Sequence, residues 1–136
     1  MNKRTLYIQP IGGISGDMFL SLMADLGVDL KELELIISEV VSVEINYQKR
    51  RTKGFSGTRV DIKYARDQRF RNLYDLHKIV ERLNVSATVK QKSINSFKRL
   101  AEVESQVHGV SISSIHFHEI GAVDTLVDVV GCFFCP

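Results

Sequence analysis

Residues 43–64 read VEINYQKRRTKGFSGTRVDIKY, and two runs of alternating apolar residues flank the polar centre of this segment. The alternating positions are Val43, Ile45 and Tyr47 in the first run and Val60, Ile62 and Tyr64 in the second. Because side chains alternate between the two faces of a strand, each run predicts a strand with one buried face. Between them, residues 48–57 carry four basic residues and a Gly54-Phe-Ser-Gly57 turn. The segment therefore predicts two neighbouring antiparallel strands joined by a basic loop.

Helical periodicity dominates the chain on both sides of this segment. Before it, apolar residues at helical spacing follow Gly16 and again Asp29, and a short β-prone run at residues 5–9 predicts a third strand. After it, three more helical patterns begin near Asn72, Ser86 and Val123. The sequence thus predicts an α+β fold, a small mixed sheet with an antiparallel hairpin and about five helices packed against it.

The bulk composition limits the partners of this chain. Its 136 residues fit one domain, and 18 Lys+Arg against 16 Asp+Glu create no strong field toward nucleic acid or an anionic membrane. The polar start matches no secretory signal, and no apolar run is long enough to span a membrane. We therefore expect a cytoplasmic protein that binds neither nucleic acid nor membrane. The only two cysteines, Cys132 and Cys135, make no disulfide framework.

Potential metal ligands are concentrated near the carboxyl end. The candidate donors are His108, His116, His118, Glu119, Asp124 and Asp128. In an extended segment His116 and His118 project to one face, and in a helix Asp124 and Asp128 lie one turn apart. Mixed imidazole and carboxylate ligands suit borderline metals such as nickel, although the spacing matches no stringent zinc signature. The alternative is that the histidines are capping or surface groups and that the carboxylates lie on the solvated face of a helix.

A second candidate is the glycine loop at residues 12–17, GGISGD, between the expected strand and the first helix. The backbone N–H groups of Gly13, Ser15 and Gly16 would form a nest for a phosphate or carboxylate. The Gly-Lys-Ser/Thr continuation of a P-loop is missing, and Asp17 would repel an anion but suit a cation. A tight turn in which Ser15 or Asp17 caps the helix is the simpler interpretation.

Several motifs together resemble the LarC family of nickel-insertion proteins. They are Gly13-Ile-Ser-Gly-Asp-Met-Phe-Leu20 with Asp25-Leu-Gly27, Gly54-Phe-Ser-Gly-Thr-Arg-Val-Asp61, Val107-His-Gly-Val110, and His116-Phe-His-Glu-Ile-Gly-Ala-Val-Asp124 with Val127-Asp-Val-Val-Gly131. The resemblance implies a cytoplasmic nickel chelatase, a lyase that inserts Ni²⁺ into a phosphorylated pyridinium bisthiocarboxylic acid mononucleotide. That reaction makes the cofactor of lactate racemase and uses CTP hydrolysis.

The resemblance also implies roles and boundaries. Residues 1–136 would form a single domain, the amino-terminal part of a longer protein. CTP, with Mg²⁺ or Mn²⁺, is expected to bind only with a carboxyl-terminal domain that this chain lacks. Donor chemistry at the matching positions makes Asp17 the candidate catalytic residue, Gly13, Ser15 and Gly16 candidates for binding the precursor, and the six donors above candidates for binding nickel.

Two departures from the family pattern keep other interpretations open. Gln9-Pro10 stands where family members typically carry Asp-Cys, and residues 65–71 contain no histidine where many members have a His-rich insert. One alternative is a noncatalytic metal-binding module that retains only the fold. Another is a structural domain that forms a homo-oligomer through the apolar residues around Phe133 and Phe134.

Overall fold

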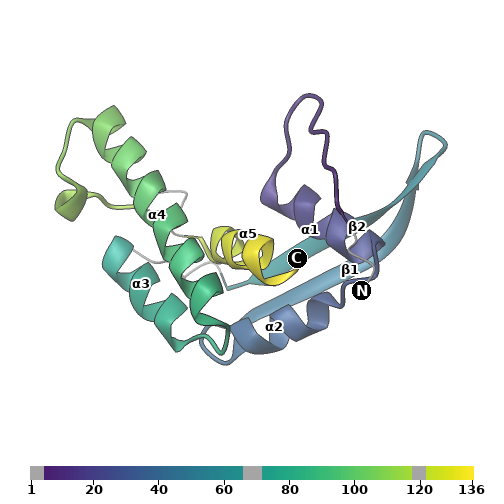
Figure 1. The fold of residues 1–136 in the computed structure, drawn as a ribbon, viewed down its shortest axis with the longest axis horizontal. Coiled ribbons are helices and arrows are strands. Elements are labelled where there is room, and N and C mark those ends of the chain that lie inside the picture. The colour runs from purple at the N-terminus through teal and green to yellow at the C-terminus, as the bar shows by residue number, and fades with distance from the viewer. Residues whose placement is uncertain (1–4, 66–71, 118–121) are drawn as a thin grey trace.

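Over the residues that the structure describes, the fold is α+β, with one antiparallel hairpin and five α-helices, as the sequence predicts. The computed structural model describes residues 5–65, 72–117 and 122–136 of the chain. In chain order the elements are α1 (Gly16–Asp25), α2 (Leu30–Ser38), β1 (Val43–Thr52), β2 (Phe55–Tyr64), α3 (Leu73–Arg82), α4 (Ala87–His108), the 3₁₀ turn η1 (Ile112–Ser114) and α5 (Val123–Phe134). Helix α5 contacts α1, α2 and β2 and also α4, which pairs with α3, so it lies between these two groups of elements (Figure 1).

The hairpin is longer than the sequence pattern predicts. Its register is continuous from the pair Val43 and Tyr64 to the pair Thr52 and Phe55. The predicted loop at residues 48–57 is therefore wrong, because most of that stretch is strand. Lys53 and Gly54 form the turn with φ of 50° and 86°, and positive φ at both central residues matches the twist of a tight two-residue hairpin. The basic residues thus lie on paired strands.

The strand expected at residues 5–9 is not formed. In the part of the chain that the structure describes, the only sheet is the two-stranded pair of β1 and β2. The outer side of β2 is covered by α1, whose Ser21 hydroxyl accepts a hydrogen bond from Val60 N at 3.2 Å. A β-prone sequence needs a neighbouring strand to supply its hydrogen bonds, and residues 5–9 have no such partner here.

The hydrophobic core lies around α5, which has more buried residues than any other helix. Its buried residues are Val123, Leu126, Val127, Val130 and Gly131. They pack with Leu20 of α1, Leu33 of α2 and Phe97 of α4, all with 1% exposure or less. Burial of each valine, leucine or phenylalanine side chain in this set contributes roughly 1.5–3 kcal/mol of transfer free energy. No helix in the described ranges is both long enough and apolar enough to cross a bilayer.

Side-chain caps define where the helices begin. Asp29 accepts a hydrogen bond from Lys31 N before α2, Asn72 from Asp75 N before α3, and Ser86 from Val89 N before α4. Each cap satisfies one backbone N–H that lacks a partner within its helix, an effect worth about 1 kcal/mol. At the other end of α4, Gly109 adopts a φ of 66°, the left-handed conformation in which glycine commonly ends a helix.

Candidate functional site

The start of α1 lies directly against Asp128 of α5. A Cβ atom added to Gly16 would be 2.4 Å from both Cβ and Cγ of Asp128 and 2.6 Å from its Oδ2. Those separations are far below van der Waals contact, so only glycine fits at position 16 in this arrangement. The packing of α1 against α5 therefore places the Gly16-Asp17 pair of the glycine loop beside Asp128, one of the candidate metal ligands.

Asp128 is the most strongly perturbed carboxyl of this site. Burial, followed by the negative charges of Asp17 and Asp124, raises its pKa from the ordinary 3.8 to about 7. Its Oδ1 atom is buried and accepts no hydrogen bond from the residues that the structure describes. A bound cation would relieve both the mutual repulsion and the unpaired oxygen, since opposite charge favours the ionised form. The electrostatics of the site therefore suit a positively charged ligand.

The other two carboxylates are fixed in different ways. Asp124 lies in the first turn of α5, one helical turn before Asp128, and accepts a hydrogen bond from Thr125 N at 2.8 Å. Asp17 is exposed and accepts a hydrogen bond from the Ser15 hydroxyl. Asp17 also lines an open hollow of about 450 Å³ between α1 and β2, which includes Arg59. A small molecule from solvent can therefore reach this side of the site.

The glycine loop forms at most part of the predicted nest of free backbone N–H groups. Gly13 has a φ of 101°, and its N–H donates to the Pro10 carbonyl at 3.1 Å, so that donor is already used in a turn. Ser15 is the N-cap residue of α1 but makes no side-chain cap, because its hydroxyl bonds to Asp17 instead. The loop is a turn that presents Asp17, and its role in binding a precursor stays a prediction.

The candidate histidines lie at different places. His116 is exposed between the buried Ile115 and Phe117 in the segment that leads toward α5. His108 is exposed at the carboxyl end of α4, the end that lies far from α1 in Figure 1. His118 and Glu119 lie outside the described residues. Among the residues that are described, no three histidine, cysteine or acidic side chains are close enough to hold a metal ion.

The two cysteines are poor ligands in this structure. Burial raises the pKa of the Cys132 thiol, and the nearby Asp128 adds to the effect. Burial and Cys132 raise the pKa of Cys135 to about 11. Because the thiolate is the form that binds metal, burial disfavours metal binding by both residues, and they lie half-buried beside their phenylalanine neighbours.

The raised pKa of Asp128 makes stability depend on pH in a predictable direction. A folded-state pKa above the unfolded value means that ionising Asp128 destabilises the fold, with the loss growing between about pH 4 and pH 7 and complete above pH 7. In metal-free protein, Asp128→Asn should therefore be more stable than the parent by about 1 kcal/mol at pH 8, a value reduced for partial solvent screening.

Urea unfolding of both proteins at pH 5 and pH 8 measures this difference. The advantage of the asparagine variant should shrink at pH 5, where more of the parent protein carries a protonated Asp128. An equal difference at both pH values would show that Asp128 ionises normally in the folded chain.

Comparison with known proteins shows the family to which the chain belongs. The family model described as "Nickel insertion protein" matches residues 6–136, nearly the whole chain. This chain belongs to the nickel insertion protein family. The resemblance drawn from its motifs is thereby confirmed, including the segments that carry Gly16 and Asp128.

Three relatives show how the chain maps onto longer members of the family. A "Putative nickel insertion protein" of Desulfotalea psychrophila is 36% identical over 98% of this chain and 35% of its own length. Two proteins named "Pyridinium-3,5-bisthiocarboxylic acid mononucleotide nickel insertion protein" are 37% identical, from a Thermotoga species, and 36% identical, from Desulfitobacterium hafniense. Both alignments cover 94% of this chain. They cover 35% of the Thermotoga protein and 32% of the Desulfitobacterium protein. The chain thus spans about a third of these relatives, and no solved structure matched it significantly.

Proposed function

We propose that this chain holds Ni²⁺ for insertion into pyridinium-3,5-bisthiocarboxylic acid mononucleotide. The observation that carries the proposal is the family match over residues 6–136. The matched residues include Gly16 and Asp128, which lie against each other in the structure. The two relatives named for this substrate support its identity. Nickel is then the cargo of the reaction, and the phosphorylated pyridinium compound is its acceptor.

The chemistry of the site suits temporary binding of nickel. Imidazole nitrogens from His116 and His118, with carboxylate oxygens from the aspartates, form a mixed set that borderline metals accept. Asp128, whose pKa is raised to about 7, must lose its proton to bind the metal, and proton uptake favours release. An incompletely protein-ligated ion leaves positions for the sulfur atoms of the acceptor, which are softer ligands than carboxylate.

We propose that further steps require the remaining sequence of the longer relatives, which this chain does not span. They are CTP hydrolysis with Mg²⁺ or Mn²⁺ and the release of a finished cofactor for lactate racemase. We also propose that the reaction takes place in the cytoplasm, where free thiols are maintained. The roles of Glu119 and His108 in nickel binding are part of the same proposal, with His108 the less favoured because α4 ends far from α1 (Figure 1).

A calorimetric titration with Ni²⁺ tests the histidine part of the proposal. The variant His116→Ala with His118→Ala should bind nickel at least about tenfold more weakly, a loss of about 1.4 kcal/mol or more, because two neutral imidazoles are removed. His77→Ala is the matched control, since His77 is an exposed histidine of α3 outside the candidate set. Equal affinities in the parent and the double variant would remove these histidines from the site.

A further inference from the structure

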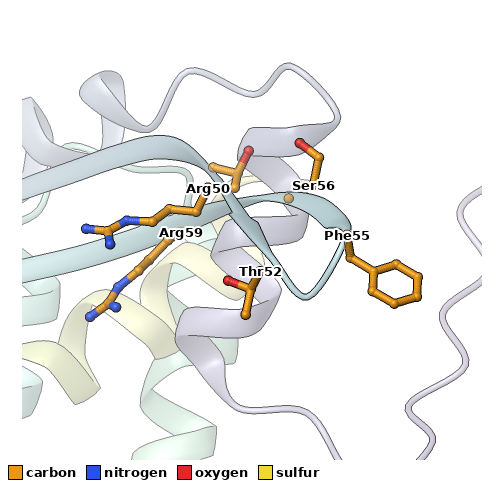
Figure 2. Close-up of a pocket in the computed structure, with 7 residues that line it drawn as sticks. Arg50, Thr52, Phe55, Ser56 and Arg59 are labelled. Carbon is orange, nitrogen blue, oxygen red and sulfur yellow. The ribbon is translucent and has the colours of Figure 1, made fainter.

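The outward face of the hairpin carries two arginines that point the same way. Arg50 of β1 pairs with Gly57, and Arg59 is two residues further along β2, so the two arginines are diagonal neighbours on one face. Diagonal neighbours in an antiparallel pair are about 7–8 Å apart at their backbones, within reach of one shared ligand for long side chains. Figure 2 shows both guanidinium groups extending in the same direction from the strands.

Gly57 leaves the space beside these arginines empty. Glycine weakens a strand interior, and it is retained there for a bulge, a special backbone angle or the close approach of another group. The register through Gly57 is regular, and Gly57 is not among the glycines with positive φ. A Cβ atom built on it meets nothing within 4 Å, so packing within the protein does not require glycine either. The open space above the Gly57 backbone therefore allows another group to approach it closely.

The charge of this surface suits an anion. Arg50 makes no ion pair with any residue that the structure describes. Arg59 donates from Nε to Asp61 Oδ1 at 2.9 Å, which engages one of its five N–H donors and leaves the others available. Both arginines line an open hollow of about 360 Å³ over the hairpin (Figure 2). Paired guanidinium groups are well suited to phosphate because each can donate two parallel hydrogen bonds.

Arg59 also connects this surface to the candidate metal site. It lines both the hollow above Gly57 and the hollow that contains Asp17. We propose that Arg50 and Arg59 bind the phosphate monoester of the mononucleotide above the Gly57 backbone, with the pyridinium end directed toward Asp17. This inference rests on the proposed function for the identity of the ligand. It adds an anchoring site on the hairpin that is separate from the nickel ligands.

The test uses nicotinic acid mononucleotide, a pyridine mononucleotide that carries a phosphate monoester, titrated calorimetrically into the intact chain. Two variants remove the site in different ways. Arg50→Gln with Arg59→Gln removes the charges, and Gly57→Val fills the hollow without changing any charge. Arg51→Gln is the matched control, because Arg51 lies on the same strand but on its other face. Circular dichroism checks that each variant is folded.

We expect both site variants to lose at least about tenfold in affinity for the mononucleotide, while Arg51→Gln retains it. Inorganic phosphate should compete, and the riboside without phosphate should bind at least about tenfold more weakly. Equal loss in Arg51→Gln, full affinity in folded Gly57→Val, or equal binding of the riboside would overturn the inference. A nickel titration of the same variants separates the two proposals, since nickel affinity should be unchanged by all three.

Discussion

Replacing Gly131 with valine is expected to lower the free energy of unfolding by about 3 kcal/mol. Gly131 is buried in α5, and a Cβ atom there would be 2.6 Å from Leu20 Cδ2 and 2.9 Å from Leu33 Cδ2. Both leucines are fully buried, so they have no free space into which to move. Valine is more informative than alanine, because alanine's better helix propensity would offset part of the clash.

Chemical denaturation of the parent and the Gly131→Val variant measures the effect. Gln106→Val, at an exposed position of α4, controls for the helix propensity of valine. A Gly131→Val protein no less stable than this control would show that α5 does not approach α1 and α2 as closely as described.

A second large effect is expected at Gly16. Gly16→Ala should cost about 2–3 kcal/mol of stability, because the new methyl group would overlap the Cβ and Cγ atoms of Asp128. The Asp128 Cβ atom is bonded to the α5 backbone, so no side-chain rotation can move it away. The helices must separate, so the variant should also bind nickel more weakly if Asp17 and Asp128 act together.

A double-mutant cycle isolates this contact. An Asp128→Gly background removes the three atoms nearest to the methyl group at position 16, so Gly16→Ala should cost much less there than in the parent. Unfolding free energies of the four proteins give the coupling directly. An equal cost in both backgrounds would mean that the effect comes from the first turn of α1 alone.

Much of the fold follows from local sequence patterns. The alternation of Val43 and Ile45 with Val60 and Ile62 predicts the hairpin, and Asn72 and Ser86 begin helices as capping residues should. The length of the hairpin was missed because residues 48–52 have no apolar alternation. The positive φ values at Lys53 and Gly54 explain the error, since a lysine in that conformation gives no sequence signal.

The candidate site was only partly predictable. Spacing places Asp124 and Asp128 on one helix face, but no local pattern shows that Gly16 lies against Asp128. That contact depends on how α1 and α5 pack, which is a tertiary property. The arginine pair was missed for a related reason, since Arg50 and Arg59 share a face only once the register is known.

Nickel K-edge X-ray absorption of the intact chain, loaded with one equivalent of Ni²⁺, tests the central claim most directly. If His116 and His118 bind nickel, the spectrum should show nitrogen and oxygen scatterers with the signature of imidazole, and this signature should weaken when both histidines are replaced by alanine. Sulfur ligation by Cys132 or Cys135 would contradict the claim, because the proposed donors are nitrogen and oxygen and burial of both thiols opposes formation of the thiolate. An unchanged spectrum in the histidine variant would contradict it equally.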